Sequence, residues 1–263
     1  MSNEQDESAR FDSLYAPVNP SQWNTRLSVI DRFQHGKNTR DDEYYFFNKY
    51  RSLVIAIGRK KELSNDDIKE LVSRVFQAVF EEFSKISAGE KPEIRMGLQE
   101  DGRNFRFKSW LTRIINNKLF DIYREYAKKG QAIDDTADAE EAGKQVIDES
   151  DQDINELWRK FLLRESLQEL REKLSATQFR IFYQVKMKGE KGPKVAAVFR
   201  QTPDNVNQIC SRAMKELLKI VESLKLEHPL EKYTDDELCR LIHDIDKEFQ
   251  KLEEEFPVGP AEA

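Results

Sequence analysis

The segment from Ile68 to Phe83 constrains the fold most, because its apolar side chains follow the helical repeat without a miss. Its apolar positions are Ile68, Leu71, Val72, Val75, Phe76, Val79, Phe80 and Phe83. The pattern predicts a helix with one buried face, beginning near Asp66 after the candidate capping residues Ser64 and Asn65. Other segments share this period, and only 10 glycines and 8 prolines are spread over the 263 residues. The chain is therefore predicted to be all-α.

Charged residues are distributed in blocks, although the net charge of the whole chain is only −6. The net charge is +6 over residues 103–129 and −9 over 130–156, then +5 over 186–225 and −8 from residue 226 to the end. Two basic blocks, each followed by an acidic one, are typical of two modules that bind a polyanion. The block 130–156 also lacks helical periodicity and aromatic residues, which predicts a flexible linker.

The predicted organisation is two small helical domains joined by this acidic linker, with an extension at each end. In chain order, the predicted parts are a flexible extension over 1–24, a helical domain over 25–129, the linker over 130–156, a second helical domain over 157–226 and an acidic helical extension over 227–263. The first domain is expected to begin with one helix over 25–60. In the C-terminal extension, Thr234 and Glu237 form a capping box before an apolar stripe, which should be buried because a lone helix is marginal in water.

Several classes of function are not expected for this chain. No apolar run approaches the roughly 18 residues that a membrane-spanning helix needs, and the N-terminus has no signal-peptide core. Cys210 and Cys239 are the only cysteines, and one lies on an apolar helix face, which favours a reducing cytoplasm over a disulfide framework. Cys239 and His243 are spaced i, i+4, but two ligands do not make a zinc site, so we expect no metal or cofactor. Without a glycine-rich phosphate loop or a nucleophile–histidine arrangement, we do not expect an enzyme.

Residues 194–217 predict two short helices joined by a tight polar turn. The expected buried positions are Val195, Ala196, Val198 and Phe199 in the first helix and Val206, Ile209, Cys210, Ala213 and Leu217 in the second. Thr202 is placed to cap the second helix, with Pro203 at its first position. The polar face of that helix carries groups that hydrogen-bond base edges and phosphates, namely Asn205, Asn207, Gln208, Ser211 and Arg212. This combination favours a helix-turn-helix whose second helix enters the DNA major groove, with an ordinary helical hairpin as the alternative.

A further helix is predicted over residues 105–129, within the first basic block. Its expected apolar face consists of Phe107, Leu111, Ile114, Ile115, Ile122 and Tyr126. The opposite face carries Arg106, Trp110, Arg113, Asn117, Arg124 and Lys128. A basic stripe with an exposed tryptophan is typical of a surface for single-stranded nucleic acid, because cations follow the backbone and aromatic rings stack on bases. The alternative is a solvated helix face whose Trp110 packs on a neighbouring helix.

The two basic segments, in this order across an acidic linker, resemble the extracytoplasmic-function sigma factors of RNA polymerase. The Trp-Leu, Arg-Ile, Asn, Asp and Arg of residues 110–124 stand at the spacing of that family's second conserved region. Residues 195–217 are similar to its fourth conserved region, a promoter-reading helix-turn-helix. Residues 67–76 stand where the family has a helix that meets the β′ clamp helices of the polymerase. The resemblance covers about residues 45–128 and 160–224.

The resemblance implies a transcription initiation factor that binds core RNA polymerase and directs it to specific promoters. The implied partners are core RNA polymerase, through its β′ clamp helices and β flap, promoter DNA, and an anti-sigma factor or other regulator, with no membrane partner. The implied polymerase-binding residues are Asp66, Asp67, Glu70, Ser73, Arg74 and Gln77. The residues implied for the melted −10 element are Arg106, Trp110, Arg113, Asn117, Arg124 and Lys128. Those implied for the −35 duplex are Thr202, Asn205, Asn207, Gln208, Ser211 and Arg212.

The chain departs from the family pattern at several positions. Lys69 and Arg74 stand where acidic residues are usual, so weaker polymerase binding than that of a typical relative is expected. Arg200 replaces a usual glycine, and a reshaped turn is expected because left-handed backbone costs a non-glycine residue about 1 kcal/mol. Two other functions remain open, a stand-alone helix-turn-helix regulator that acts without core polymerase and an interaction protein such as an anti-sigma antagonist. The C-terminal extension would either pack on the second domain or fold over its DNA-binding surface.

Overall fold

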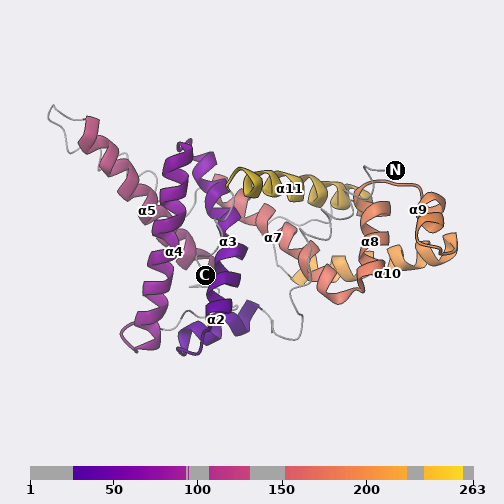
Figure 1. Cartoon of the computed structure of the whole chain (residues 1–263), viewed down its shortest axis with the longest axis horizontal. Coiled ribbons are helices and arrows are strands. Elements are labelled where there is room, and N and C mark those ends of the chain that lie inside the picture. Colours follow the sequence, from indigo (N-terminus) through magenta and orange to yellow (C-terminus); the bar gives the residue numbers. More distant parts are fainter. Residues whose placement is uncertain (1–25, 93, 95–106, 131–151, 224–233, 257–263) are drawn as a thin grey trace. The chain divides into compact units, whose positions relative to one another are not determined.

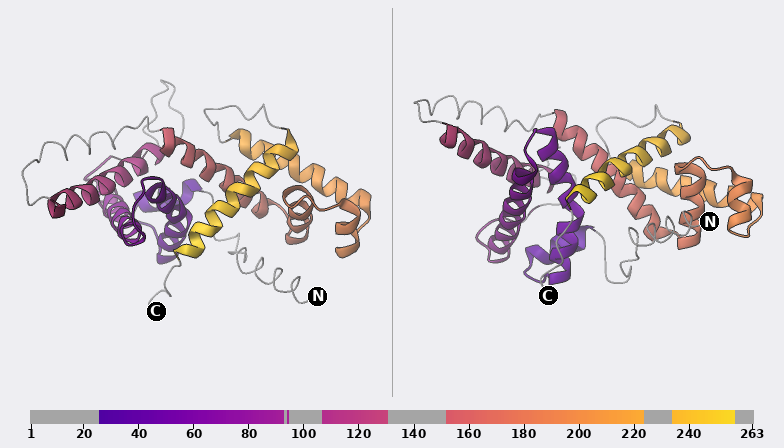
Figure 2. Two further views of the ribbon diagram at one scale, coloured as in Figure 1. Left: turned by 90° about the horizontal axis from the view of Figure 1, so that it is seen from above. Right: turned by 45° about the horizontal axis from the view of Figure 1, so that its top comes forward.

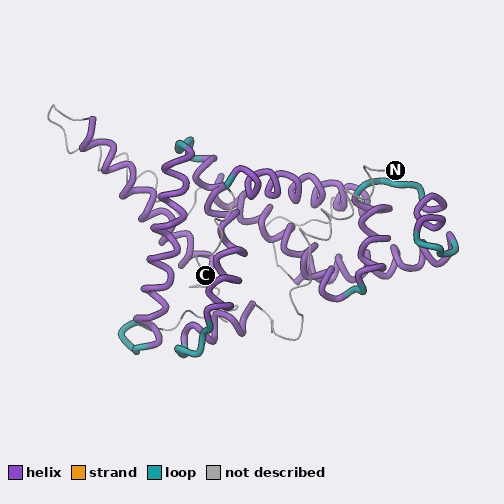
Figure 3. Tube along the Cα trace, in the orientation of Figure 1, coloured by secondary structure: helices purple, strands orange, loops and turns teal. Residues whose placement is uncertain are grey.

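The computed structural model describes residues 26–92, 94, 107–130, 152–223 and 234–256, and these residues are helices and short connections (Figures 1 and 3). The helices are α2 (Arg26–Gln34), α3 (Arg40–Lys60), α4 (Asn65–Ser87), α5 (Phe107–Gly130), α7 (Gln152–Lys173), α8 (Ala176–Phe182), the π-helix η1 (Tyr183–Met187), α9 (Gly192–Val198), α10 (Pro203–Ser223) and α11 (Asp235–Glu255). The described part contains no strand, so the all-α prediction is confirmed for it. None of its helices is long and apolar enough to cross a membrane.

The prediction of one helix over 25–60 is wrong, because the structure has two helices there. Gly36 adopts a left-handed φ of 63°, which ends α2 because residues with a side chain rarely adopt this backbone. Thr39 then begins α3. Its hydroxyl accepts the backbone N–H of Asp42 at 3.3 Å, and the Asp42 carboxylate accepts the Thr39 backbone N–H at 2.9 Å. This reciprocal capping was not recognised, although the run of polar residues over 34–43 separates the apolar positions of α2 from those of α3.

The described residues form two compact units, and the first contains residues up to 46 together with those of 80–107. Its core is aromatic. The rings of Phe33 and Phe83 stack with centroids 4.6 Å apart, and Phe46 meets each of them edge-on at 5.7 Å. Arg32 pairs with the buried carboxylate of Asp42 beside this cluster, and its hydrogen bond lowers the pKa of Asp42.

The second unit contains residues 47–79 and the described residues from 108 onward. Within it, α7 packs on the second half of α3, where Tyr50 and Phe161 have ring centroids 5.5 Å apart and Lys49 pairs with Glu165. The predicted domain bounds, 25–129 and 157–226, follow a different division and stay a prediction. The described part of α7 already begins at Gln152, and residues 131–151 of the predicted linker lie outside the described residues.

The C-terminal helix α11 belongs to this second unit and packs against α7 and η1 (Figures 1 and 2). The predicted capping box is present, because the Thr234 side chain accepts the Glu237 backbone N–H while the Glu237 carboxylate accepts that of Thr234. The predicted apolar stripe is buried at Leu238, Ile242, Ile245 and Phe249. Of the two arrangements considered for the extension, the structure thus has the packed helix.

Candidate nucleic-acid interface

The helix pair α9–α10 is built around a small apolar cluster. Its buried members are Ile181, Val195, Ala196, Val206 and Cys210, with Val185, Phe199 and Ile209 packed against them. Val195 and Ala196 of α9 are buried in this cluster, as expected from the sequence. The predicted burial of Val198 is wrong, because its side chain is 70% exposed at the end of α9. Phe199 is only half-buried and takes its place beside the cluster.

The turn between the two helices keeps a left-handed residue. Arg200 has a φ of 52°, so the expectation that an arginine here reshapes the turn is wrong. The backbone N–H of Gln201 then donates to the carbonyl of Ala196 at 2.9 Å, which closes the turn over the end of α9. Thr202 caps α10 as predicted, because its hydroxyl accepts the backbone N–H of Asn205 at 3.2 Å.

The polar face of α10 is exposed to solvent. The predicted contact residues Thr202, Asn205, Asn207, Gln208, Ser211 and Arg212 all lie on this surface. Asn205 donates through its amide to Gln201 at 2.6 Å, and Arg212 lies 3.5 Å from the amide oxygen of Gln208. These local contacts are exposed to solvent, so these groups can exchange them for contacts with DNA, since exposed hydrogen bonds already compete with water. Asn207 lies at the edge of this face, with its amide oxygen directed toward Gly192 at the start of α9.

On α5 the structure separates the predicted residues. Arg113, Asn117 and Arg124 are exposed, whereas Trp110 is only 2% exposed and belongs to the core. The prediction of an exposed tryptophan is therefore wrong, and the packing alternative describes Trp110. Arg106 lies outside the described residues, as does the side chain of Lys128. Arg124 pairs with Asp121 at 3.3 Å and lies over the ring of Phe120 at 5.7 Å.

The predicted apolar face of α5 is mostly buried, with one exception. Tyr126 is 45% exposed, and its hydroxyl donates a hydrogen bond to the carboxylate of Asp67 on α4. The hydroxyl of Ser64 donates to the same carboxylate, and these two bonds lower the pKa of Asp67. Sequence reasoning placed Tyr126 in the core because it falls on the apolar arc. Its position near the end of α5, one helical turn beyond Ile122, gives it a polar neighbour instead.

The predicted polymerase-binding residues share one surface of α4. Asp66, Glu70, Ser73 and Gln77 are exposed, and Asp67 and Arg74 are partly buried. Arg74 donates to Glu70 at 2.8 Å and to both carboxylate oxygens of Glu125 on α5 at 2.7 and 3.0 Å. These hydrogen bonds raise the pKa of Arg74. The role of Glu125 was missed, because nothing in the local pattern of α5 marks an acidic residue as the partner of α4.

The described residues contain no group of three or more histidine, cysteine, aspartate or glutamate side chains that could hold a metal ion. Cys210 and Cys239 are both buried free thiols, and burial raises the pKa of Cys239 to about 12. Comparisons of the chain with protein-family models, with curated proteins and with solved structures give no match. The function is therefore inferred from the two exposed surfaces of α5 and α10 and from the resemblance in their sequences.

Proposed function

We propose that this chain is a sigma-type transcription initiation factor, which binds core RNA polymerase and directs it to specific promoters. The observation that carries the proposal is the exposed face of α10. Asn205, Gln208 and Arg212 stand on one side of a capped helix that follows a tight turn, while its other side is buried against α9 and α8. Amide groups on such a helix can hydrogen-bond base edges in the major groove and a guanidinium can contact phosphates, so α10 would read the −35 duplex.

The exposed residues of α5 support contact with a second DNA element. Arg113, Asn117 and Arg124 would follow the backbone of the melted −10 strand, with Arg106 and Lys128 extending the same face in the sequence. Trp110 takes no part as a stacking ring while it remains in the core. In this proposal Trp110 instead holds α5 in place, and a base would have to stack on another group.

The mixed surface of α4 would meet core polymerase. Asp66, Asp67 and Glu70 supply the acidic groups, while Arg74 neutralises part of that surface through its bonds to Glu70 and Glu125. Long-range attraction to a basic partner would be reduced accordingly, because opposite charges within one surface cancel at a distance. We therefore propose polymerase binding that is weaker and less salt-dependent than that of an entirely acidic face. The proposed location is the cytoplasm.

A stand-alone helix-turn-helix regulator is the second candidate, and the burial of Trp110 favours it. Without a stacking ring, the exposed candidates on α5 for contact with a second DNA element are two arginines and one asparagine, Arg113, Arg124 and Asn117. A regulator of this kind would bind duplex DNA through α10 alone. It would need neither the face of α4 nor core polymerase.

One experiment separates the two candidates. The purified chain is mixed with core RNA polymerase, the complex is isolated by size exclusion, and the complex is given duplex genomic fragments for run-off transcription. We expect a stable complex and transcripts that begin at defined sites only when chain and core polymerase are both present. Sequence-specific duplex binding by the chain alone, with no complex and no new start sites, would contradict the initiation-factor proposal and favour the regulator.

A further inference from the structure

The acidic helix α11 contacts different parts of the second unit with its two halves. It carries nine acidic and three basic residues, a net charge of −6. In its first half, Asp236 pairs with Lys186 of η1 at 2.9 Å, and the ring nitrogen of His243 lies 3.3 Å from the hydroxyl of Tyr183. The thiol of Cys239 lies 3.6 Å from the sulfur of Met214 on α10. This half is thus attached to the helices that carry the candidate DNA-reading face.

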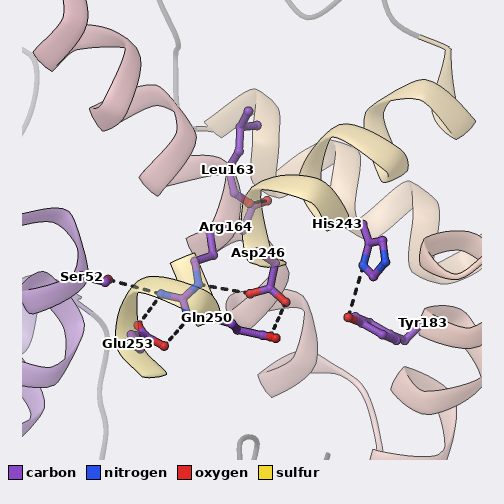
Figure 4. Close-up of polar contacts among 9 residues, drawn as sticks. Ser52, Leu163, Arg164, Tyr183, His243, Asp246, Gln250 and Glu253 are labelled. Atoms are coloured by element: carbon purple, nitrogen blue, oxygen red, sulfur yellow. Dashed lines mark hydrogen bonds and ion pairs between the residues drawn. The ribbon is translucent and has the colours of Figure 1, made fainter. Parts of the chain in front are cut away.

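The second half of α11 is attached to α7 and α3 through one buried arginine (Figure 4). Arg164 of α7 donates to Asp246 at 3.1 Å and forms a two-bond contact with Glu253 at 2.8 and 3.0 Å. Its guanidinium also donates to the hydroxyl of Ser52 on α3 at 3.3 Å. Three helices therefore meet at one side chain, and the carboxylate of Asp246 has no exposed surface at all.

The end of α11 docks directly on α3. Arg51 donates to the backbone carbonyl of Phe256 at 2.6 Å, which satisfies a carbonyl just beyond the last turn. Arg59 pairs with Glu255 at 2.7 Å and lies over the ring of Phe256 at 5.1 Å. These contacts place the C-terminal end of α11 against α3 while its beginning lies against η1 and α10.

The chemistry of the Arg164 contact indicates a function in alignment more than in stability. Burying charges costs solvation energy, so well-packed apolar residues of similar volume often stabilise such a position as well or better. What the charged contact adds is geometry, because a guanidinium donates to two carboxylates only when they lie at fixed positions around its plane. Burial lowers the pKa of Arg164, but the hydrogen bond and charge of Glu253 and the charge of Asp246 outweigh it and raise the pKa overall. The arginine is therefore charged wherever the helix is docked.

We propose that Arg164, Asp246 and Glu253 form a register lock, through which α11 holds η1 and α10 at one position relative to α3. An apolar stripe alone would let α11 slide by a turn along α7, because similar side chains recur along it. The lock fixes one of these registers. One consequence rests on the proposed function: the faces of α5 and α10 would be held at one separation, so the chain would accept a narrow range of spacings between two promoter elements.

The lock is tested in the full chain, without DNA or polymerase. Spin labels are attached at Ser73→Cys on α4 and Glu222→Cys on α10, both exposed positions, while the buried Cys210 and Cys239 are not expected to react. Double electron–electron resonance then gives the distribution of label distances. The test variant is Arg164→Met with Asp246→Leu and Glu253→Gln, which removes all three charges together and leaves no buried charge unpaired.

We expect one narrow distribution for the chain with its native lock, and a distribution at least twice as wide for the test variant at similar helicity and thermal stability. The control variant carries Asp244→Asn, Lys251→Met and Glu254→Gln on the exposed face of α11, and it should keep the narrow distribution. A narrow, unshifted distribution in the folded test variant would overturn the proposal. If the test variant loses helicity, Ser52→Ala with Glu253→Gln is measured in its place. These changes remove the bonds of Arg164 to α3 and to Glu253, but they keep its buried pair with Asp246, so no buried charge is left unpaired. The same widening is expected, and a narrow, unshifted distribution would again overturn the proposal.

The measurement does not depend on promoter binding, so its outcome is separate from that of the proposed function. If the lock holds and the run-off experiment fails, α11 aligns the helices of a protein with another activity. If both hold, templates with one to three base pairs added between the two elements should be used better by the test variant than by the native chain. If the test variant has a widened distribution but uses promoters of every spacing as well as the native chain does, the lock acts only in the free protein.

Discussion

The indole N–H of Trp158 on α7 donates to the hydroxyl of Thr112 on α5 at 2.9 Å, and both side chains are buried. Thr112 lies inside the segment 110–124 that carries the family resemblance, directly before the exposed Arg113. Losing one partner of a polar pair at this depth destabilises the fold, because the remaining buried donor or acceptor has given up its hydrogen bond to water and has no replacement. The bond therefore fixes the orientation of α5 against α7 at the point where α5 presents its candidate DNA contacts.

We expect Thr112→Val to lower the free energy of unfolding by about 1–3 kcal/mol, because it leaves the Trp158 indole N–H buried without its acceptor. Trp158→Phe should cost less in the Thr112→Val background than in the native chain, since the donor has then already lost its partner. Chemical denaturation of the four proteins in this cycle measures the coupling. Thr177→Val on the exposed surface of α8 is the control and should change stability by less than about 0.5 kcal/mol. Additive effects of Thr112→Val and Trp158→Phe would contradict the assignment.

The left-handed backbone at Arg200 predicts an unusual order of stability for substitutions. Arg200→Gly should be more stable than Arg200→Ala by about 1 kcal/mol, because only glycine adopts a φ near 52° without steric cost. Both variants lose the same charge, so the comparison isolates the backbone. At the exposed Lys215 inside α10 the order should reverse, with alanine favoured by about 1 kcal/mol. Thermal unfolding of the four variants checks both orders, and alanine equal to glycine at position 200 would be evidence against the turn described.

Two residues of α10 should differ in how they affect DNA binding. Arg212→Ala should weaken binding to every duplex and reduce the salt slope by about one unit, if its guanidinium contacts a phosphate. Gln208→Ala should change the preferred sequence at one position by about 1–3 kcal/mol, because an amide that contacts a base edge carries specificity. Fluorescence anisotropy against a set of single-substituted duplexes at several salt concentrations separates the two effects. Lys219→Ala, further along α10, is the control. Equal losses on all duplexes for both variants would mean that the two residues do not divide these roles.

The pairing of Arg74 predicts opposite effects from two substitutions on α4. Arg74→Ala should strengthen binding to core polymerase, because Glu70 and Glu125 then present their charges unneutralised. Glu70→Lys should weaken it, and each effect should stay within about 1 kcal/mol at the exposed surface. Pull-down titration with core polymerase measures both, with circular dichroism as a check that helicity is unchanged. Glu222→Lys on α10 is the control for net charge. If Arg74→Ala weakened binding, Arg74 itself would be the contact and the acidic-face proposal would be wrong.

The helices follow from periodicity, and their capping follows from local chemistry. The capping box at Thr234 and the cap at Thr202 were predicted, because each depends on residues only three positions apart in the sequence. The break at Gly36 was missed, although the polar run 34–43 and the capping pair Thr39 and Asp42 both mark it. Periodicity reports which arc of a helix is apolar, but it does not report a single glycine that turns left-handed.

The candidate site was predicted less completely, because contacts between distant helices leave no local pattern. A helical wheel placed Trp110 opposite the apolar arc, yet α5 is covered from more than one side and the indole is buried. Equally, nothing near Arg164 in the sequence indicates that an arginine is buried against carboxylates 82 and 89 residues away. The exposed residues of α10 were predicted correctly, since one helix with one buried side leaves the other side to solvent.

His243 lies at the contact between α11 and η1, where a change in its protonation would alter the packing of the two helices. Its imidazole is buried against the ring of Tyr183, with centroids 5.6 Å apart. Burial lowers its pKa first, and the charges of Lys247 and Lys188 lower it further, while Asp244 and Asp246 act in the opposite direction. The folded state therefore binds a proton on this ring less readily than the unfolded chain does.

The sign of the expected pH dependence follows from that difference. Above the unfolded pKa of about 6.5, His243 is neutral in both states and contributes no dependence. As the pH falls below this value, the unfolded chain takes up the proton first, so the free energy of unfolding decreases until the folded pKa is reached. We expect His243→Gln to flatten the stability curve between pH 7 and 5, measured by urea unfolding at closely spaced pH values. Thr177→Val, which changes an exposed group that does not titrate, is the control and should leave the shape of the curve unchanged. A native chain that became more stable on acidification through this window would show that His243 is charged in the folded state.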